Sequence, residues 1–140
     1  MTKIPRYWTK AKKYLSRKDK TLSKLIKSYE SPSETILTSR GDIFFSLCKS
    51  IIGQQISVAA ANSVFLKFKK KCNNNITAKN VSKLSFFQLK NCGLSRQKVL
   101  GIKSLAKQMI EKTFNPKLID KMSDEEAINY LSKLKQIGRW

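Results

Sequence analysis

Two short segments of the chain carry residue types whose spacing points to chemistry. The first ends the most apolar stretch, where Gln54 and Gln55 stand in succession before Ser57, although an apolar helix needs no pair of glutamines before a capping serine. The second is the run Ile137 to Trp140, where a helix leads into a tight turn and Gly138 is expected to free the backbone. Backbone amides in such a turn can approach a phosphate. Taken singly, the segments are explained more simply, as solvated residues at a helix end and as an ordinary helix C-cap.

Composition excludes several other kinds of site. Histidine is absent, which removes Ser-His triads, Cys-His pairs, His-ligated zinc and imidazole proton shuttles. Acid–base chemistry within the chain would have to come from its nine carboxylates. Cys48, Cys72 and Cys92 are widely spaced and form no C-x-x-C pair, so they predict no disulfide framework and no metal site. We expect buried, reduced thiols in a cytoplasmic protein.

The charge of the chain favours a polyanionic partner. Twenty-nine Lys and Arg residues face nine Asp and Glu residues, giving a net charge of +20. The simpler explanation is codon bias in an AT-rich genome, because Lys far outnumbers Arg. Codon bias does not, however, clear carboxylates from half of a chain, and no acidic residue occurs from Ile43 to Ile110, where cationic residues recur throughout.

The elements that must position these residues are predicted to be helices alone. Apolar residues recur at spacings of three and four, and no run alternates as a strand would. About seven such stretches are predicted; the first is 6–15, and helix-capping residues precede the other six, at Asp19, Asp42, Ser57, Ser85, Ser95 and Ser123. Ser85 with Gln88, and Ser123 with Glu126, fit the capping-box spacing, and Asn115-Pro116 is expected to end the longest helix. Gly93 is expected in a left-handed position.

The 140 residues suit a single helical domain. The N-terminus has no apolar core of a signal peptide, and Lys49 interrupts the best apolar run, so we expect no membrane span. The sequence predicts a monomer in the cytoplasm, in bacterial terms the cytoplasm or nucleoid.

Three motifs, in order, resemble one family. Gly53–Ser57 resembles the signature G-Q-Q-[IV]-S, Asn91–Lys98 resembles a G-L-S-x-x-K segment, and Leu134–Trp140 resembles the hairpin L-x-G-I-G-x-W. The chain from Asp42 to Trp140 is similar to the helix-hairpin-helix DNA glycosylases, in the 3-methyladenine DNA glycosylase II (AlkA-like) branch. One position departs, because the first glycine of the hairpin is Gln136 here.

The resemblance implies an all-α helix-hairpin-helix DNA glycosylase fold, incomplete at the C-terminus. Residues 1–40 would form N-terminal helices, 41–133 the middle helical layer and 134–140 the start of the hairpin. The family's catalytic Asp is expected downstream of Trp140, so no residue of this chain would be catalytic. The isolated 140-residue chain is therefore expected to be inactive.

The resemblance also assigns roles to residues of this chain. Gln55 falls where the family places the side chain that wedges into the duplex, and Gln54 lies beside it. Trp140 would line the base pocket, where an indole suits a positively charged alkylated purine. The residues implied in contacts with the DNA backbone are Gln136, Ile137, Gly138, Arg139, Arg96 and Lys98. Hairpin carbonyls would hold at most a monovalent cation, with no other cofactor and no metal site.

The implied function is base-excision repair. The enzyme would flip an alkylated purine of the 3-methyladenine type out of double-stranded DNA and hydrolyse its N-glycosidic bond. A related branch has a lyase lysine at the position of Trp140, so this chain would be monofunctional. Two alternatives stay open: a non-catalytic basic helix-hairpin-helix module that binds DNA through phosphates, and a basic helical protein of ribonucleoprotein assembly.

Overall fold

The computed structural model describes residues 6–29 and 42–139, and the chain divides into two compact units, residues 1–41 and 42–140. The predicted organisation as one domain, with its parts 1–40, 41–133 and 134–140, stays a prediction. Each unit is described below by itself.

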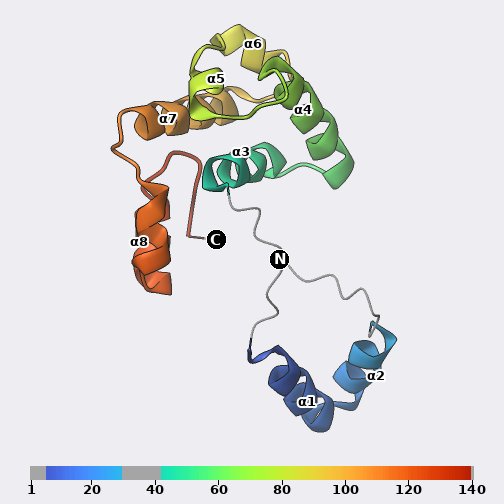
Figure 1. Cartoon of the computed structure of the whole chain (residues 1–140). Coiled ribbons are helices and arrows are strands. Elements are labelled where there is room, and N and C mark those ends of the chain that lie inside the picture. Colours follow the sequence, from blue (N-terminus) through green and yellow to red (C-terminus); the bar gives the residue numbers. More distant parts are fainter. Residues whose placement is uncertain (1–5, 30–41, 140) are drawn as a thin grey trace. The chain divides into compact units, whose positions relative to one another are not determined.

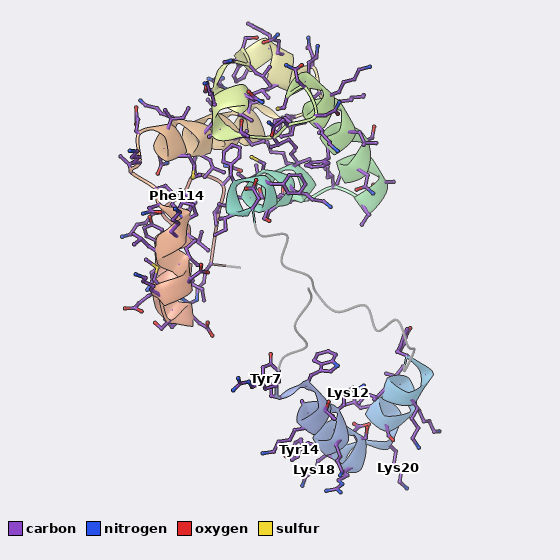
Figure 2. All side chains as sticks on the ribbon, viewed as in Figure 1. Tyr7, Lys12, Tyr14, Lys18, Lys20 and Phe114 are labelled. Atoms are coloured by element: carbon purple, nitrogen blue, oxygen red, sulfur yellow. The ribbon has the colours of Figure 1, made fainter. Side chains whose placement is uncertain are left out.

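The first unit contains a pair of helices, α1 (Trp8–Lys18) and α2 (Lys20–Ser28), which contact each other. Asp19 caps α2 as predicted, since its carboxylate accepts hydrogen bonds from the N–H groups of Thr21 and Leu22. Neither helix contains a buried residue. On the surface of α1, the Lys18 ammonium lies 5.9 Å from the centre of the Tyr14 ring, and Figure 2 labels both side chains.

The second unit contains the remaining helices of the described chain. They are α3 (Ile43–Gly53), α4 (Val58–Lys71), α5 (Ala78–Ser82), α6 (Phe86–Lys90), α7 (Arg96–Ile110), the 3₁₀ helix η1 (Pro116–Lys121) and α8 (Asp124–Leu131). The described residues include no strand, which confirms the all-α prediction. None of the described helices is long and apolar enough to cross a bilayer.

These helices begin at the capping residues that the sequence predicted. Asp42, Ser57 and Ser95 each accept a hydrogen bond from a backbone N–H in the first turn of the following helix. Both predicted capping boxes form. In the second box, Glu126 accepts hydrogen bonds from the backbone N–H and the hydroxyl of Ser123, which lower the pKa of Glu126.

Three features differ from the sequence prediction. The short helix α5 and the 3₁₀ helix η1 were not predicted, because five or six residues are too few to show a helical period and neither begins with a capping box as α6 does. The longest helix, α7, ends at Ile110 and not at Asn115-Pro116, since Lys112 takes a left-handed conformation with φ 59°. Asn115 instead caps η1, where its side chain accepts a hydrogen bond from the N–H of Lys117.

The core of the second unit lies between α3 and α7, which pack against each other (Figure 1). Helices α5 and α6 pack on α7, and α4 packs on α3 and α6. The fully buried side chains include Phe68, Ile51, Ile52, Leu89, Ile102, Leu105, Val81, Val99, Cys48, Cys72 and Cys92. The three thiols are free and buried, as the sequence predicted. Gly93 has the predicted left-handed backbone, with φ 97°.

The segment after α7 is held to α8 by an aromatic pair. Phe114, labelled in Figure 2, is buried and stacks on Tyr130 of α8 with ring centroids 5.4 Å apart. The Tyr130 hydroxyl also accepts a hydrogen bond from the N–H of Asn115 at 2.9 Å. These contacts fix the chain that leads into the residues after α8.

Candidate functional site

The first part of the site is the α3–α4 loop, residues 54–57. Its two glutamines differ: Gln54 is half-buried, whereas Gln55 is exposed and takes a left-handed conformation with φ 56°. Apolar side chains next to Gln55 also face solvent, since Ile56 is 40% exposed and Val58 is 78% exposed. A protruding amide beside exposed apolar groups is suited to meet another surface rather than water.

The second part is the turn after α8, residues 135–139. The left-handed residue of this turn is Gln136, with φ 68°, at the position where the family pattern has glycine. The expectation that Gly138 frees the backbone was wrong, because Gly138 has no left-handed φ. A Cβ added at Gly138 would meet no atom of the described residues within 4 Å, so no contact in that part of the chain requires glycine there. Ile137 is half-buried.

A hydrogen bond joins the two parts. The side-chain nitrogen Nε2 of Gln54 donates to the backbone oxygen of Gln136 at 2.6 Å, across 82 residues of sequence. The bond uses the amide of Gln54 inside the protein, whereas the amide of Gln55 stays exposed. The glutamine pair and the turn therefore form one continuous site.

Lys98 of α7 fixes the loop from the other side. Its Nζ donates to the backbone oxygens of Ile52 and Gln54, at 2.9 and 2.8 Å. These carbonyls belong to the end of α3, where backbone acceptors lack partners within the helix. The ammonium, predicted to contact DNA, thus makes two hydrogen bonds within the protein.

Gly101 is a residue of the site that the sequence prediction missed. A Cβ at this position would lie 2.7 Å from Cγ of Gln136 and 3.3 Å from the backbone oxygen of Lys135. The absence of a side chain at Gly101 therefore lets the turn lie directly on α7. The signal was present in the sequence, because a glycine inside a long helix costs about 1 kcal/mol relative to alanine and calls for a packing reason.

The other predicted DNA contacts are exposed. Arg139 donates to both carboxylate oxygens of Glu125, at 2.7 and 3.0 Å, with both side chains 65% exposed. Arg96 is exposed at the start of α7. Trp140, predicted to line the base pocket, lies outside the described residues, so its distance from Gln55 stays untested.

The hydrogen bonds of the site, within the described residues, join side-chain amide, ammonium and backbone carbonyl groups. No carboxylate hydrogen-bonds to Gln54, Lys98 or Gln136. The acidic residues nearest in sequence to the turn are Asp124, Glu125 and Glu126, which occupy the first turn of α8, where they favour the helix dipole. Within the described ranges, no group of three or more Cys, Asp or Glu residues could hold a metal ion. The arrangement can bind and orient a partner.

Comparison with known proteins identifies a family and several relatives. The profile described as HhH-GPD superfamily base excision DNA repair protein matches residues 48–138. The chain is 30% identical over 135 residues to DNA-3-methyladenine glycosylase 1 of Schizosaccharomyces pombe, covering 94% of this chain and 59% of that protein. It is 31% identical over 137 residues to the alkylbase DNA glycosidase-like protein mag2 of the same yeast, covering 95% of this chain and 64% of that protein.

Two solved structures are similar. The 3-methyladenine DNA glycosylase Mag1 of S. pombe, in complex with abasic DNA, matches with a TM-score of 0.82 and 28% identity over 94% of this chain and 65% of that chain. The 3-methyladenine DNA-glycosylase of Archaeoglobus fulgidus matches with a TM-score of 0.71 and 25% identity over 99% of this chain and 55% of that chain. This chain thus spans less than two thirds of its relatives.

The matched region, residues 48–138, contains the α3–α4 loop, Lys98 and the turn up to Gly138, which are the parts that the hydrogen bonds bring together. The family match therefore covers the residues that form this site. The chain belongs to the HhH-GPD superfamily of base excision DNA repair proteins.

Proposed function

We propose that this protein is a DNA glycosylase that removes alkylated purines of the 3-methyladenine type from double-stranded DNA. Family membership and the names of the relatives support the proposal. The observation that carries it for this chain is the 2.6 Å hydrogen bond from Gln54 to Gln136, which joins the α3–α4 loop to the turn of residues 135–139. A loop that enters the duplex and a turn that holds its backbone must be fixed relative to each other.

In the proposed mechanism Gln55 enters the duplex. Flipping a nucleotide costs a few kcal/mol and is easiest for a damaged or weakly paired base. The exposed amide of Gln55 occupies the vacated space, while Ile56 and Val58 contact the flanking bases or sugars. Trp140 stacks on the extruded base, and the positive charge of an alkylated purine strengthens that stacking.

The turn contacts the DNA backbone in this proposal. Gly138 is the position of closest approach, because its open backbone has no intramolecular reason to lack a side chain. Arg139 exchanges Glu125 for a phosphate, since an exposed ion pair contributes only about 0–1 kcal/mol. Lys98 acts as a positioning residue for the α3–α4 loop. A monovalent cation would share the carbonyl of Gln136 with the amide of Gln54 or use other carbonyls of the turn, since a carbonyl oxygen has two lone pairs.

Hydrolysis of the N-glycosidic bond requires more than these residues. Water adds to the sugar carbon as the base leaves, and a carboxylate stabilises the positive charge on the sugar. The described carboxylates make no hydrogen bond to the site residues Gln54, Lys98 and Gln136. We therefore expect the 140-residue chain to bind damaged duplexes as a monomer and to release no base. With a catalytic carboxylate supplied, the reaction would be monofunctional, because Trp140 offers no amine for strand cleavage.

The test compares binding of the 140-residue chain to a duplex with one abasic-site analogue and to the same duplex unmodified. The wild-type chain should prefer the abasic duplex, and Gln55→Ala should lose most of that preference while keeping its affinity for the unmodified duplex. Gln97→Ala, at another exposed glutamine, is the matched control and should keep the preference. Equal binding of both duplexes by the wild-type chain would contradict the proposal. Efficient release of 3-methyladenine would contradict the expected inactivity of this chain.

A non-catalytic DNA-binding module is the second candidate. The absence of hydrogen bonds from the described carboxylates to Gln54, Lys98 and Gln136 favours it. Such a module would bind both duplexes equally through phosphates, so the same experiment separates the two candidates.

A further inference from the structure

A second basic surface lies at the other end of α4 from the glutamine pair. It is a groove of about 520 Å³ lined by Lys67, Lys70, Lys71, Asn73, Asn91 and Cys92, which we call the lysine groove. The glutamine pair precedes the first turn of α4, whereas the three lysines occupy its last turns. At a rise of about 1.5 Å per residue, the lysines lie roughly 14–20 Å along the helix from its start.

The three lysines share one face of α4 and have no carboxylate partner. Positions 67, 70 and 71 are spaced by three and four residues, so their side chains are neighbours and repel one another. No ion pair joins them to any residue within the described ranges, and the sequence has no acidic residue from Ile43 to Ile110. Such a concentration of charge is an unfavourable arrangement in the protein alone.

Capping of the helix end does not explain these lysines. Three of the last four carbonyls of α4 already accept hydrogen bonds: the N–H of Cys72 donates to the oxygens of Phe68 and Lys69, and the N–H groups of Asn73 and Asn74 donate to those of Lys70 and Lys69. The lysine ammonium groups are therefore not needed as donors to the backbone. All three are exposed.

The groove also offers neutral donors. The side-chain amides of Asn73 and Asn91 make no hydrogen bond to the rest of the described protein, whereas Asn80 nearby donates to the backbone oxygen of Asn75. Cys92 also lines the groove; burial raises the pKa of its thiol, and the charges of Lys71 and Lys67 act against that increase. Three cations and two free amides around one hollow match the oxygens of a phosphate.

We propose that the lysine groove binds phosphates of the DNA backbone outside the site where the base is flipped. The inference rests on the proposed function, because it takes DNA as the source of the phosphates. A backbone held at both ends of α4 would extend the footprint of the protein along the duplex and add affinity that does not depend on damage. Each phosphate contact releases counterions, which makes its contribution dependent on salt.

The first experiment measures affinity for the unmodified duplex as a function of salt concentration. The variant combines Lys67→Gln, Lys70→Gln and Lys71→Gln, and the matched control combines Lys79→Gln, Lys117→Gln and Lys121→Gln, which are exposed and outside the groove. Both lose three charges. We expect the slope of log K against log salt to fall by about 2–3 in the groove variant and by less than 1 in the control, with a loss of affinity of roughly tenfold or more. Equal losses in the two variants would overturn the proposal.

The second experiment titrates inorganic phosphate and follows side-chain amide resonances by NMR. Those of Asn73 and Asn91 should shift and saturate, while that of the exposed Asn129 should not. No shift at Asn73 and Asn91 would overturn the site. If the Asn73 and Asn91 resonances shift but the two triple variants bind DNA with the same salt dependence, the groove binds phosphate but not the phosphates of DNA. The proposed function is tested separately, because it fails if the wild-type chain shows no preference for abasic DNA. The groove variant should leave that preference unchanged.

Discussion

Gln136 holds a left-handed backbone while its side chain lies against Gly101, a position in α7 that has no side chain of its own. The two features belong together. A residue with a Cβ resists the left-handed region, and contact with α7 together with the hydrogen bond from Gln54 keeps the turn in that conformation. The family pattern avoids the strain with glycine at the position of Gln136, whereas this chain accommodates the glutamine by packing.

Gly101→Ala should destabilise the second unit. The new Cβ would come within 2.7 Å of Cγ of Gln136, and the backbone oxygen of Lys135 at 3.3 Å limits how far the turn can adjust. The clash costs about 1–3 kcal/mol, so after the gain of about 1 kcal/mol in helix propensity we expect a net loss of up to about 2 kcal/mol in the free energy of unfolding, measured by urea denaturation. Gly53→Ala is the control, because a Cβ there meets nothing within 4 Å. Because alanine gains about 1 kcal/mol over glycine inside a helix, a Gly101→Ala variant more stable than wild type by that amount would show that the turn is not fixed on α7.

Gln136→Asn and Gln136→Val should differ in their effect on the free energy of unfolding. Asparagine adopts the left-handed region more readily than other residues, so stability should change little. Valine is β-branched and resists that region, so Gln136→Val should lose about 1–2 kcal/mol. Thermal unfolding of both variants tests this. Equal stability of the Asn and Val variants would contradict the prediction, because a turn without a positive φ at this position would not discriminate between the two residues.

The helices follow from local sequence to a large extent. Caps such as Asp42, Ser57 and Ser95 act on the next few residues, so the sequence alone locates the starts of α3, α4 and α7. The end of α7 was predicted less well, because Lys112 is not a residue type that signals a left-handed terminus. Short elements such as α5 depend on packing and give no period to detect.

The site was predictable only in part, for a physical reason. The motifs place Gln54, Lys98 and Gln136 in one site by resemblance, but the use of each polar atom depends on how α3, α7 and the turn pack. The Lys98 ammonium reaches the end of α3, so it forms two internal hydrogen bonds, a result that its charge alone does not predict. The same holds for Arg139 and Glu125, which are 14 residues apart.

The buried thiols should react only when the protein unfolds. Burial, together with the neighbouring Cys92, raises the pKa of Cys72 to about 11, and burial raises those of Cys48 and Cys92 as well. At pH 8 the thiolate is the reactive form and is scarce, so labelling by Ellman's reagent should be slow in buffer and fast in urea. Fast labelling of the folded protein would contradict the buried positions.

The same thiols should make stability fall at alkaline pH. Between the ordinary thiol pKa of 9.0 and the raised pKa of about 11, the unfolded Cys72 loses its proton while the folded Cys72 keeps it. The unfolded state therefore binds fewer protons, and the free energy of unfolding decreases as pH rises through this window. Urea unfolding of wild type and Cys72→Ala at pH 8, 9 and 10 separates this effect from titration of the lysines, which both proteins share. The wild type should show the steeper decline, and parallel profiles would refute the assignment.

Lys98→Met should weaken the α3–α4 loop rather than remove a contact with DNA. The substitution keeps the stem of the side chain but leaves the carbonyls of Ile52 and Gln54 without their donor, at a cost of about 1–3 kcal/mol. The preference for abasic over unmodified duplex should fall, because the loop that carries Gln55 is no longer fixed.

The salt dependence of binding distinguishes a positioning role of Lys98 from a contact with DNA. A lysine that contacts a phosphate contributes about 0.9 to the slope of log K against log salt. A lysine whose ammonium is hydrogen-bonded inside the protein contributes little to that slope. Lys79→Met, at an exposed lysine, controls for the loss of one charge. If Lys98→Met lowers the slope by 0.9 more than Lys79→Met and leaves stability unchanged, Lys98 contacts the DNA backbone and the positioning role is wrong.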